Sequence, residues 1–368
     1  MRHSFYLIFI GFLFASVSLY AQCNGHESLC FKSYNEVAYL TTHNAYSSFE
    51  DGFDLPNQNL NITSQLNQGV RAFMLDVYSE DNALLLYHNT SALGSSLLLD
   101  VLDEFKTFVD AHPNEVLTLI LEDYSLISDL SDALASSGIF EHLFVFDEQN
   151  GWPTLQEMID LNKRIVLFSD QVVENSPSWF HYIWEHAVET HYSNASINHF
   201  SCDYNRGDAQ NDLFILNHFI TDILLVLTNV ELYNEHVLEV NSNPFFLNRV
   251  SSCEEQASKF PNFITVDFFD VGNCLEVVHM LNNVPNLALY KTHSSPIIYP
   301  NPSRGFVHVK NMPSLTYFRI TNLQGEQVHE DIGIERSHHD VILNLSLLDR
   351  GFYFLHFEGG VSPIILID

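Results

Sequence analysis

Basic residues are scarce in this sequence. It has 15 lysines and arginines against 46 aspartates and glutamates, which gives a formal net charge of −31 over 368 residues. A charge of this sign repels phosphate backbones and strongly anionic lipid surfaces at long range. We therefore expect no nucleic acid among the partners of this protein.

Long apolar runs are missing beyond the N-terminus. There, Arg2 and His3 precede the run FYLIFIGFLFASVSLY, and Ala21 offers a small residue for cleavage. This pattern predicts a signal peptide over residues 1–21 and a secreted or cell-surface protein; a membrane anchor is the alternative, but the run is short for a span. The later stretch DILLVL, residues 222–227, forms either a buried helix or an apolar lip that makes transient contact with a membrane surface.

Cysteine is also limited to five residues, and no C-x-x-C pair occurs, so a zinc site is not expected. Export would permit disulfides. Cys23 and Cys30 are close enough in sequence to pair, and a bond from Cys202 to Cys253 would close a long loop, worth about 4 kcal/mol. Cys274 would then be left over. The alternative is that all five are reduced and buried.

Short apolar runs that alternate with helical patterns predict an α/β protein. Apolar residues recur at helical spacing over 98–108, Pro113 follows, and TLQE at 154–157 has the form of a capping box. Eight strands with helical connections favour a parallel barrel, and a doubly wound open sheet is the competing architecture. The eight predicted strands are 36–43, 71–78, 83–89, 116–124, 164–170, 187–192, 212–219 and 262–269.

Polar side chains stand where several of these strands end. They are His43 with Asn44, then Asp76, His88 and Glu122. In a barrel the carboxyl ends of the strands meet at one mouth, where active sites collect. Two histidines with several carboxylates suit phosphodiester chemistry, because one group can remove a proton from a hydroxyl while another protonates the leaving oxygen. For any single histidine of the 19 present, a surface or core role is the alternative.

Four segments resemble one family in order and spacing: THNAY, QGVRAFMLDVY, LYHN and LTLILEDY. They are similar to the X domain of phosphatidylinositol-specific phospholipase C, and the resemblance covers about residues 31–285. It implies a distorted (β/α)8 TIM barrel, which we expect to fill residues 22–290. It also implies cleavage of the glycerol side of a phosphodiester, usually by a neighbouring inositol hydroxyl that gives a cyclic phosphate.

The resemblance assigns roles to two histidines. His43 matches the residue that acts as base or stabilises the pentacovalent phosphorane, and His88 matches the usual general acid. Asp267, at the end of the last predicted strand, is a candidate to orient His43 through a hydrogen bond. Loop capping is the alternative role for Asp267.

The resemblance also implies a metal site. Asn44, Asp76 and Glu122 match the Ca²⁺ ligands of the metal-dependent branch, whereas the Asp-x-Arg pair of the metal-independent branch does not occur on the second strand. Met74 stands where that metal-dependent branch has an acidic ligand, and a thioether is a poor ligand for a hard cation. Asp123 points to the opposite face of the strand from Glu122, so we do not expect it to replace the acidic ligand that is missing at Met74.

The C-terminal segment has a different pattern. Alternating apolar and polar residues between turn signals predict a small all-β sandwich over residues 297–368, after a linker at 291–296. YPNP, NLQGEQV and L-x-x-GFYF resemble the C-terminal sorting domain of the type IX secretion system. This implies the type IX machinery as a partner, export across an outer membrane and removal of the tail; a carbohydrate-binding appendage is the alternative.

Three functional hypotheses follow. The leading one is a secreted phosphoric diester hydrolase of the phospholipase C type that acts on an inositol lipid, a lipid anchor or a related glycerophosphodiester. The second is a catalytically weakened barrel that binds a phosphorylated ligand, which Met74 would permit. The third is a phosphodiesterase whose substrate is not a lipid.

Overall fold

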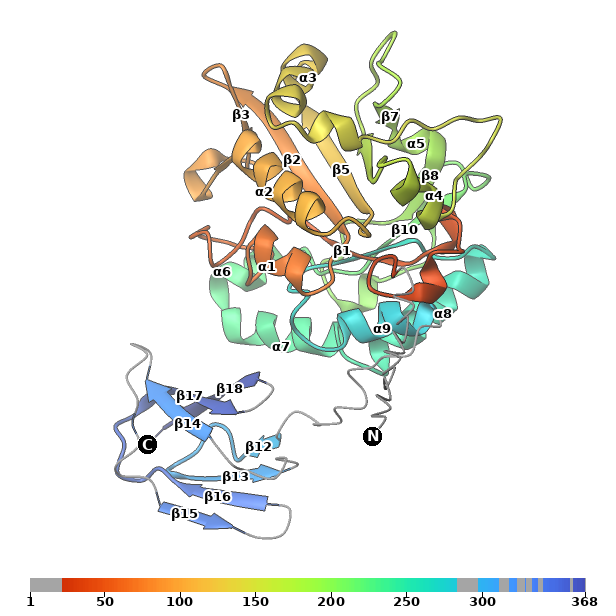
Figure 1. The fold of residues 1–368 in the computed structure, drawn as a ribbon. Helices are drawn as coiled ribbons and strands as arrows, with labels where there is room; N and C mark the ends of the chain where they lie inside the picture. Colours follow the sequence, from red (N-terminus) through yellow and green to blue (C-terminus); the bar gives the residue numbers. More distant parts are fainter. Residues whose placement is uncertain are drawn as a thin grey trace, which may run out of the picture. The chain divides into compact units, whose positions relative to one another are not determined.

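The computed structural model describes residues 22–282, 297–310, 318–322, 328, 333–336, 340–357 and 360–367. The predicted signal peptide at 1–21 and the predicted linker at 291–296 lie outside these residues. The chain divides into two compact units, Met1–Pro285 and Asn286–Asp368 (Figure 1). The domain limits expected from the sequence, 22–290 and 297–368, remain predictions.

The larger unit is built on one curled, mixed sheet of eleven strands (Figure 1). Its main path runs β7-β6-β5-β2-β1-β11-β10-β8-β9, and every pair from β7 to β8 is parallel. The sheet curls into a barrel whose path stays open between β7 and β9 in the described part of the chain. The expected distorted barrel is confirmed in this open form. The strands are β1 Tyr39–Thr42, β2 Ala72–Glu80, β3 Ala83–Leu86, β4 Ser96–Leu97, β5 Leu117–Tyr124, β6 Ile165–Ser169, β7 His181–Tyr182, β8 Ala187–Thr190, β9 Tyr204–Gly207, β10 Leu213–Asn217 and β11 Phe263–Val266.

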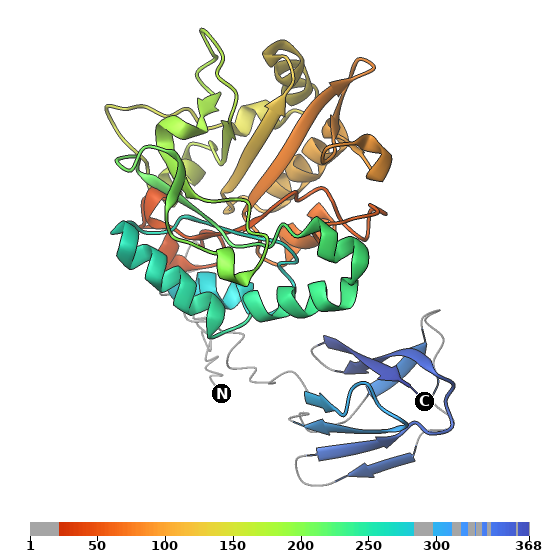
Figure 2. The same ribbon diagram turned by 180° about the vertical axis from the view of Figure 1, so that it is seen from behind.

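Helices surround the sheet, as the two opposite views show (Figures 1 and 2). The predicted helix over 98–108 is α2, and the predicted capping box starts α4, where the Thr154 side chain accepts a hydrogen bond from the Glu157 backbone. Among the described residues, no helix has the length and apolar character needed to cross a membrane. The helices are α1 Ile62–Asn67, α2 Leu98–Ala111, α3 Ile127–Ser136, α4 Leu155–Asp160, α5 Ile183–His186, α6 Ile223–Thr228, α7 Val230–Val240, α8 Phe245–Ala257 and α9 Cys274–Leu281.

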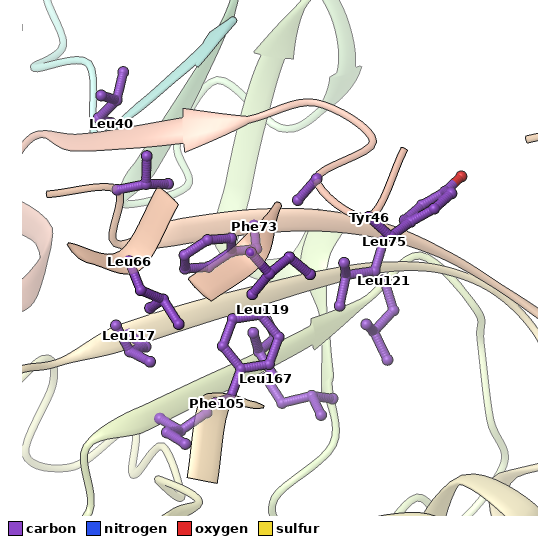
Figure 3. Close-up of a cluster of buried hydrophobic side chains, with 14 of the residues drawn as sticks. Leu40, Tyr46, Leu66, Phe73, Leu75, Phe105, Leu117, Leu119, Leu121 and Leu167 are labelled. Atoms are coloured by element: carbon purple, nitrogen blue, oxygen red, sulfur yellow. The ribbon is translucent and has the colours of Figure 1, made fainter. Parts of the chain in front are cut away.

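Strand alternation divides the core into two layers. Phe73 and Leu75 of β2 point outward and pack with Phe105 of α2 and its neighbours (Figure 3). Ala72 and the partly buried Met74, on the other face of β2, belong to the cluster inside the barrel. Since successive side chains alternate, Asp76 continues the inward row toward the carboxyl end of the strand.

One predicted barrel strand has a different partner and direction. The run 83–89 forms β3, which ends at Leu86 and pairs antiparallel with β2 as a hairpin. The turn consists of Asp81 and Asn82, both with positive φ (49° and 63°), as a two-residue hairpin turn requires. Two residues cannot make the long crossover that a parallel neighbour needs, so the turn decides the direction.

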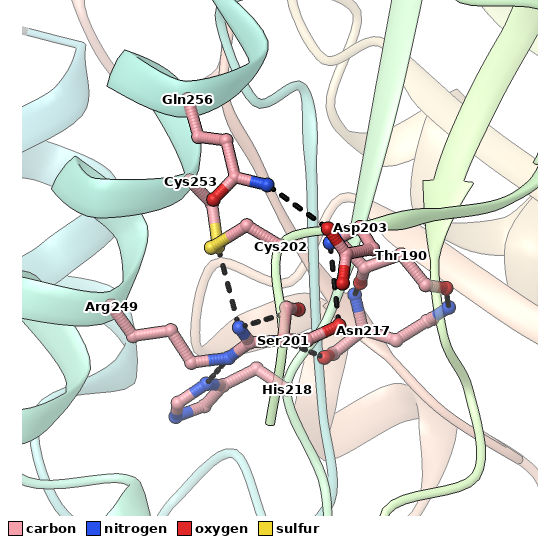
Figure 4. Close-up of a disulfide and its surroundings, with 9 residues drawn as sticks. All are labelled: Thr190, Ser201, Cys202, Asp203, Asn217, His218, Arg249, Cys253 and Gln256. Carbon is pink, nitrogen blue, oxygen red and sulfur yellow. Dashed lines mark hydrogen bonds between the residues drawn. A yellow bond between two sulfur atoms is a disulfide. The ribbon is translucent and has the colours of Figure 1, made fainter. Parts of the chain in front are cut away.

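Both expected disulfides are present, between Cys23 and Cys30 and between Cys202 and Cys253. Cys274 is unpaired and buried. Near the second disulfide, the buried Arg249 donates hydrogen bonds to the carbonyl oxygens of Ser201 and Asn217 and to the His218 ring (Figure 4). The Arg249 side chain therefore ties the carboxyl end of β10 to helix α8.

The smaller unit is the expected all-β sandwich. Its two antiparallel sheets have the orders β12-β13-β16-β15 and β14-β17-β18. Val307, Ile320, Leu343 and Leu355 come from both sheets and share one buried cluster. The strands are β12 Ile297–Tyr299, β13 Phe306–Lys310, β14 Phe318–Asn322, β15 Gly333–Arg336, β16 Asp340–Asn344, β17 Gly351–Phe357 and β18 Gly360–Leu366.

Truncation of the outer core should destabilise the larger unit. Phe105 is fully buried and its ring lies 4.8 Å from that of Phe73, so Phe105→Ala should lower the free energy of unfolding by about 3 to 5 kcal/mol. Leu99→Ala is the control on the same helix, where the side chain is 40 % exposed. Urea unfolding followed by circular dichroism measures both, and equal losses would contradict this packing.

Candidate active site

His43 and Asp267 come from neighbouring strands and form a direct hydrogen bond. His43 follows β1 and Asp267 follows β11, and the parallel register pairs Thr42 with Val266, one position earlier on each strand. The His43 Nδ1 atom lies 2.9 Å from Asp267 Oδ1. The predicted partnership of these residues therefore has a geometric basis in the barrel.

The ring of His43 is held on its face as well. It stacks on the Phe219 ring, with centroids 3.9 Å apart and planes at 9°. Phe219 lies two residues beyond β10, the strand next to β11. The His43 side chain keeps 21 % of its surface exposed, so a substrate can reach it.

Opposing effects act on the charge of His43. Burial of the ring favours the neutral form, but the Asp267 carboxylate and the charges of Asp76 and Glu122 outweigh that effect. The pKa of His43 is therefore raised above its ordinary value. An imidazole with a raised pKa is a stronger base in its neutral form.

Three carboxylates form a row across adjacent strands at the mouth. Asp76 of β2 pairs in register with Glu122 of β5. Asp170 follows Ser169, the register partner of Leu121, so it stands beside Glu122. Neighbouring strands lie about 4.8 Å apart, which brings three negative charges within reach of one another.

Asp76 is the most buried member of this row, with 5 % of its surface exposed. Burial and the nearby charge of Glu122 raise the pKa of Asp76 to about 7. The buried Tyr46 hydroxyl interacts with this carboxylate, but it makes no hydrogen bond of standard geometry with the described residues. A buried carboxylate with so little compensation is costly.

His88 reaches the mouth by way of the hairpin. Leu86 of β3 pairs with Val77 of β2, so the register brings Tyr87 to the level of Asp76 and His88 one residue further along. Its side chain is exposed, and the Asn89 amide nitrogen lies 3.1 Å from Nε2. Surrounding atoms desolvate the ring in part and a protonated His43 repels a second positive charge, and both effects lower the pKa of His88.

The expected Ca²⁺ ligands offer suitable oxygen atoms. Asn44 has 1 % exposure, and the backbone of the next residue donates to the Met74 carbonyl, which places Asn44 beside β2 near Asp76. One amide oxygen and the carboxylates of Asp76 and Glu122 are donors that Ca²⁺ prefers. The burial of Asp76, which Tyr46 and His43 offset only in part, fits a bound cation, so this residue set is compatible with the ion.

Met74 and Asp123 supply no ligand to the expected Ca²⁺ site. Met74 packs into the interior cluster, so no carboxylate stands there. Asp123 is buried on the opposite face of β5, where Ser125 donates two hydrogen bonds to it. The expectation that Asp123 does not compensate agrees with this position.

Four residues at the mouth were not predicted as site residues: Asn57, Tyr46, Phe219 and Asp170. Asp170 ends an apolar strand just as Asp76 and Glu122 do, so the same sequence signal could have found it. Phe219 ends the predicted strand 212–219 on the same face as the inward Ile215, so strand alternation could also have found it. Asn57 and Tyr46 lie on loops, where no periodicity marks an inward-facing position.

A second acidic group lies elsewhere. Asp110, Glu141 and His142 have possible metal-binding atoms within 4.8 Å of one another, the one such group of histidine, cysteine and acidic residues among the described residues. Lys106 already pairs with both Asp110 and Glu141. The positive charge of Lys106 thus offsets part of the negative charge of this surface group.

Comparison with known proteins agrees with the geometry. The family model of the PI-PLC X domain matches residues 29–282. The chain belongs to the PI-PLC X family. Residues 297–365 match the family model of the secretion system C-terminal sorting domain.

Two curated relatives show how far the X-domain similarity extends. An uncharacterized secreted protein of Arthroderma benhamiae is 26 % identical over 290 residues, which cover 71 % of this chain and 64 % of the relative. A PI-PLC X domain-containing protein of Arabidopsis thaliana is 27 % identical over 278 residues, which cover 68 % and 62 %. The chain thus spans slightly less than two thirds of the length of these two relatives.

Solved structures with a similar arrangement include phosphatidylinositol-specific phospholipase C of Staphylococcus aureus. The overlap has a TM-score of 0.47 at 16 % identity and covers 68 % of this chain and 93 % of that chain. A glycerophosphodiester phosphodiesterase of Parabacteroides distasonis overlaps with a TM-score of 0.29 at 14 % identity, over 67 % of this chain and 97 % of that chain.

The charge of Asp267 should control the protonation of His43 in this X domain. Asp267→Asn removes the carboxylate that favours the imidazolium, so the pKa of His43 should fall. Proton NMR of the His43 ring during a pH titration in chelator measures the change. Asp270→Asn is the control, because that carboxylate accepts from Asn59 instead; an unchanged His43 pKa in Asp267→Asn would contradict the assigned pairing.

Proposed function

We propose that this protein is a secreted phosphoric diester hydrolase of the phospholipase C type. The observation that carries the proposal is the His43 ring, held by Asp267 and Phe219 and coupled electrostatically to His88. Membership of the PI-PLC X family supports the reaction class. We propose an inositol lipid, a lipid anchor or a related glycerophosphodiester as the substrate.

The proposed reaction uses the two imidazoles as a base and an acid. Neutral His43 removes the proton from the attacking hydroxyl, whose oxygen bonds to phosphorus. The bond from phosphorus to the leaving oxygen then breaks, and protonated His88 gives that oxygen its proton. The raised pKa of His43 strengthens the base, and the lowered pKa of His88 strengthens the acid.

We include Ca²⁺ in the proposal, held by Asn44, Asp76 and Glu122. When bound, the ion would offset phosphate charge at a mouth that is otherwise rich in carboxylates. With three protein ligands and Met74 in place of a fourth, we expect weak binding. The role of Asp267 is to hold His43 in position.

Export belongs to the same proposal. The sorting-domain match at residues 297–365 supports delivery through the type IX secretion machinery. We propose that residues 1–21 direct the chain across the inner membrane and are cleaved. The C-terminal unit would then take the protein across the outer membrane and be removed on the way.

An apolar lip adjoins the site and supports contact with a lipid surface. Helix α6 starts four residues after Phe219, and its Leu224 and Leu227 are 67 % and 65 % exposed. Val230 and Leu238 of α7 are also more than half exposed. Of the two alternatives for DILLVL, the exposure of Leu224 and Leu227 favours the apolar lip over the buried helix. Because the chain is strongly acidic, we expect a zwitterionic rather than an anionic membrane.

Loss of either imidazole should abolish turnover. His43→Ala and His88→Ala should each lower kcat on a chromogenic inositol phosphodiester by about a hundredfold or more. His199→Ala is the control, since its exposed ring bonds only the nearby Ser196 among the described residues. If neither loss reduces turnover, the hydrolase assignment fails; phosphate binding without turnover in the wild type would favour the weakened binding barrel that Met74 permits.

The lip should matter only for substrates in a membrane. Leu224→Ser with Leu227→Ser should reduce sedimentation with phosphatidylcholine vesicles by about tenfold, because two exposed apolar side chains lose their transfer free energy. Turnover of the water-soluble diester should not change. Vesicle binding equal to that of the wild type would contradict the lip.

A further inference from the structure

Asn57 lies between Asp267, which holds His43, and Asn44, which is proposed to bind the cation. It lies on the loop between β1 and α1, with its backbone nitrogen bonded to Ser47 O and its backbone oxygen bonded to Phe268 N. These contacts anchor the residue on the chain that follows β1 and on the chain that follows β11. The backbone of Asn57 is therefore held next to Asp267.

The side-chain amide of Asn57 donates a hydrogen bond at one end and accepts one at the other. Its Nδ2 atom lies 3.2 Å from each carboxylate oxygen of Asp267. Its Oδ1 atom accepts a hydrogen bond of 3.2 Å from Nδ2 of Asn44. One planar group thus connects the residue that holds His43 with a residue proposed to hold the cation.

Donor and acceptor chemistry fixes the orientation of this series. An ionised carboxylate only accepts, so Asp267 requires the NH₂ end of Asn57. The carbonyl oxygen of Asn57 must then face Asn44, which in turn presents its own NH₂ end. The carbonyl oxygen of Asn44 is left on the other side of its amide, and it accepts no hydrogen bond from the described residues.

Backbone conformation at both ends indicates a held geometry. Asn44 has φ of 45° and Phe268, next to Asp267, has φ of 48°. A positive φ is unfavourable for a bulky residue such as phenylalanine and persists only where surrounding contacts impose it. The Asn57 carbonyl supplies one contact, and Asn241 Nδ2 supplies two more, to the carbonyls of Asp267 and Phe268.

We infer that Asn57 is a positioning residue that holds Asp267 against His43 and at the same time turns the Asn44 carbonyl oxygen toward a divalent cation. This rests on the proposed function, which it deepens by linking the acid-base pair to the ion site. It also gives Asn44 a single orientation, in which the oxygen and not the nitrogen faces the site. A hard cation requires that orientation.

Two variants of the full chain test the inference. Asn57→Ala removes the amide, and the isosteric Asn57→Asp replaces the donor to Asp267 with a like charge. Each should lower kcat on the chromogenic inositol phosphodiester by about tenfold to a hundredfold, with KM changed by less than about threefold. Asn59→Ala is the control on the same loop, since Asn59 donates to the exposed side of Asp270.

A second readout does not depend on turnover. Calcium added to the metal-free protein should raise the Tm, and the concentration for half of the rise should be about tenfold higher in Asn57→Ala. Asn57→Asp keeps an oxygen that accepts from Asn44, so its calcium response should change by less than that of Asn57→Ala. Asn44→Ala combined with Asn57→Ala should weaken the calcium response of the Tm little more than Asn44→Ala alone does. The two residues act on the ion through one contact, the hydrogen bond between their amides. Circular dichroism and the Tm in chelator show that each variant is folded.

The outcomes separate the inference from the function. If the wild type turns over and responds to calcium while both Asn57 variants match Asn59→Ala, the role of Asn57 is overturned and the hydrolase stands. Absence of a calcium effect on the wild-type Tm overturns the cation half of the inference. Absence of wild-type turnover overturns the proposed function, whatever calcium does.

Discussion

The hydrogen bond between His43 and Asp267 is the contact on which the site depends. The two residues are 224 positions apart and meet only because the last barrel strand lies beside the first. A slip of one residue in this register would turn one of the two side chains to the opposite face of the sheet. Packing of the whole barrel therefore stabilises the position of a single imidazole, and Phe219 and Asn57 add local support.

Charge places a second constraint on the mouth. Asp76, Glu122 and Asp170 stand in a row, and a phosphodiester that approaches them is itself an anion. Without a positive charge, the three carboxylates repel an anionic substrate that enters the mouth. The burial of Asp76, which its neighbours offset only in part, points to the same need. A bound cation and the protonated His88 imidazole are the groups in the proposal that would meet it.

The amino-acid pattern predicts the positions at the strand ends more fully than the loops. Each of the eight predicted runs forms a strand, so the pattern places His43, Asp76, Glu122 and Asp267 at one mouth, although it does not locate the short strands β4, β7 and β9. The direction of β3 could not be predicted in this way, because an apolar run has the same appearance in parallel and antiparallel strands. The turn at Asp81 and Asn82 carries that information.

Loop residues are outside the reach of such arguments. Asn57 acts through contacts with residues that are distant in sequence, and no periodic neighbour marks its position as inward. The residues that hold the site therefore become visible only when the strands are arranged in space.

The most direct test of the account is a crystal structure of the protein with inositol phosphate and calcium. Phosphate oxygens should lie within hydrogen-bonding distance of both the His43 and His88 rings, with Asp267 still on His43 Nδ1. A phosphate bound away from either ring, or rings that face different parts of the molecule, would contradict it.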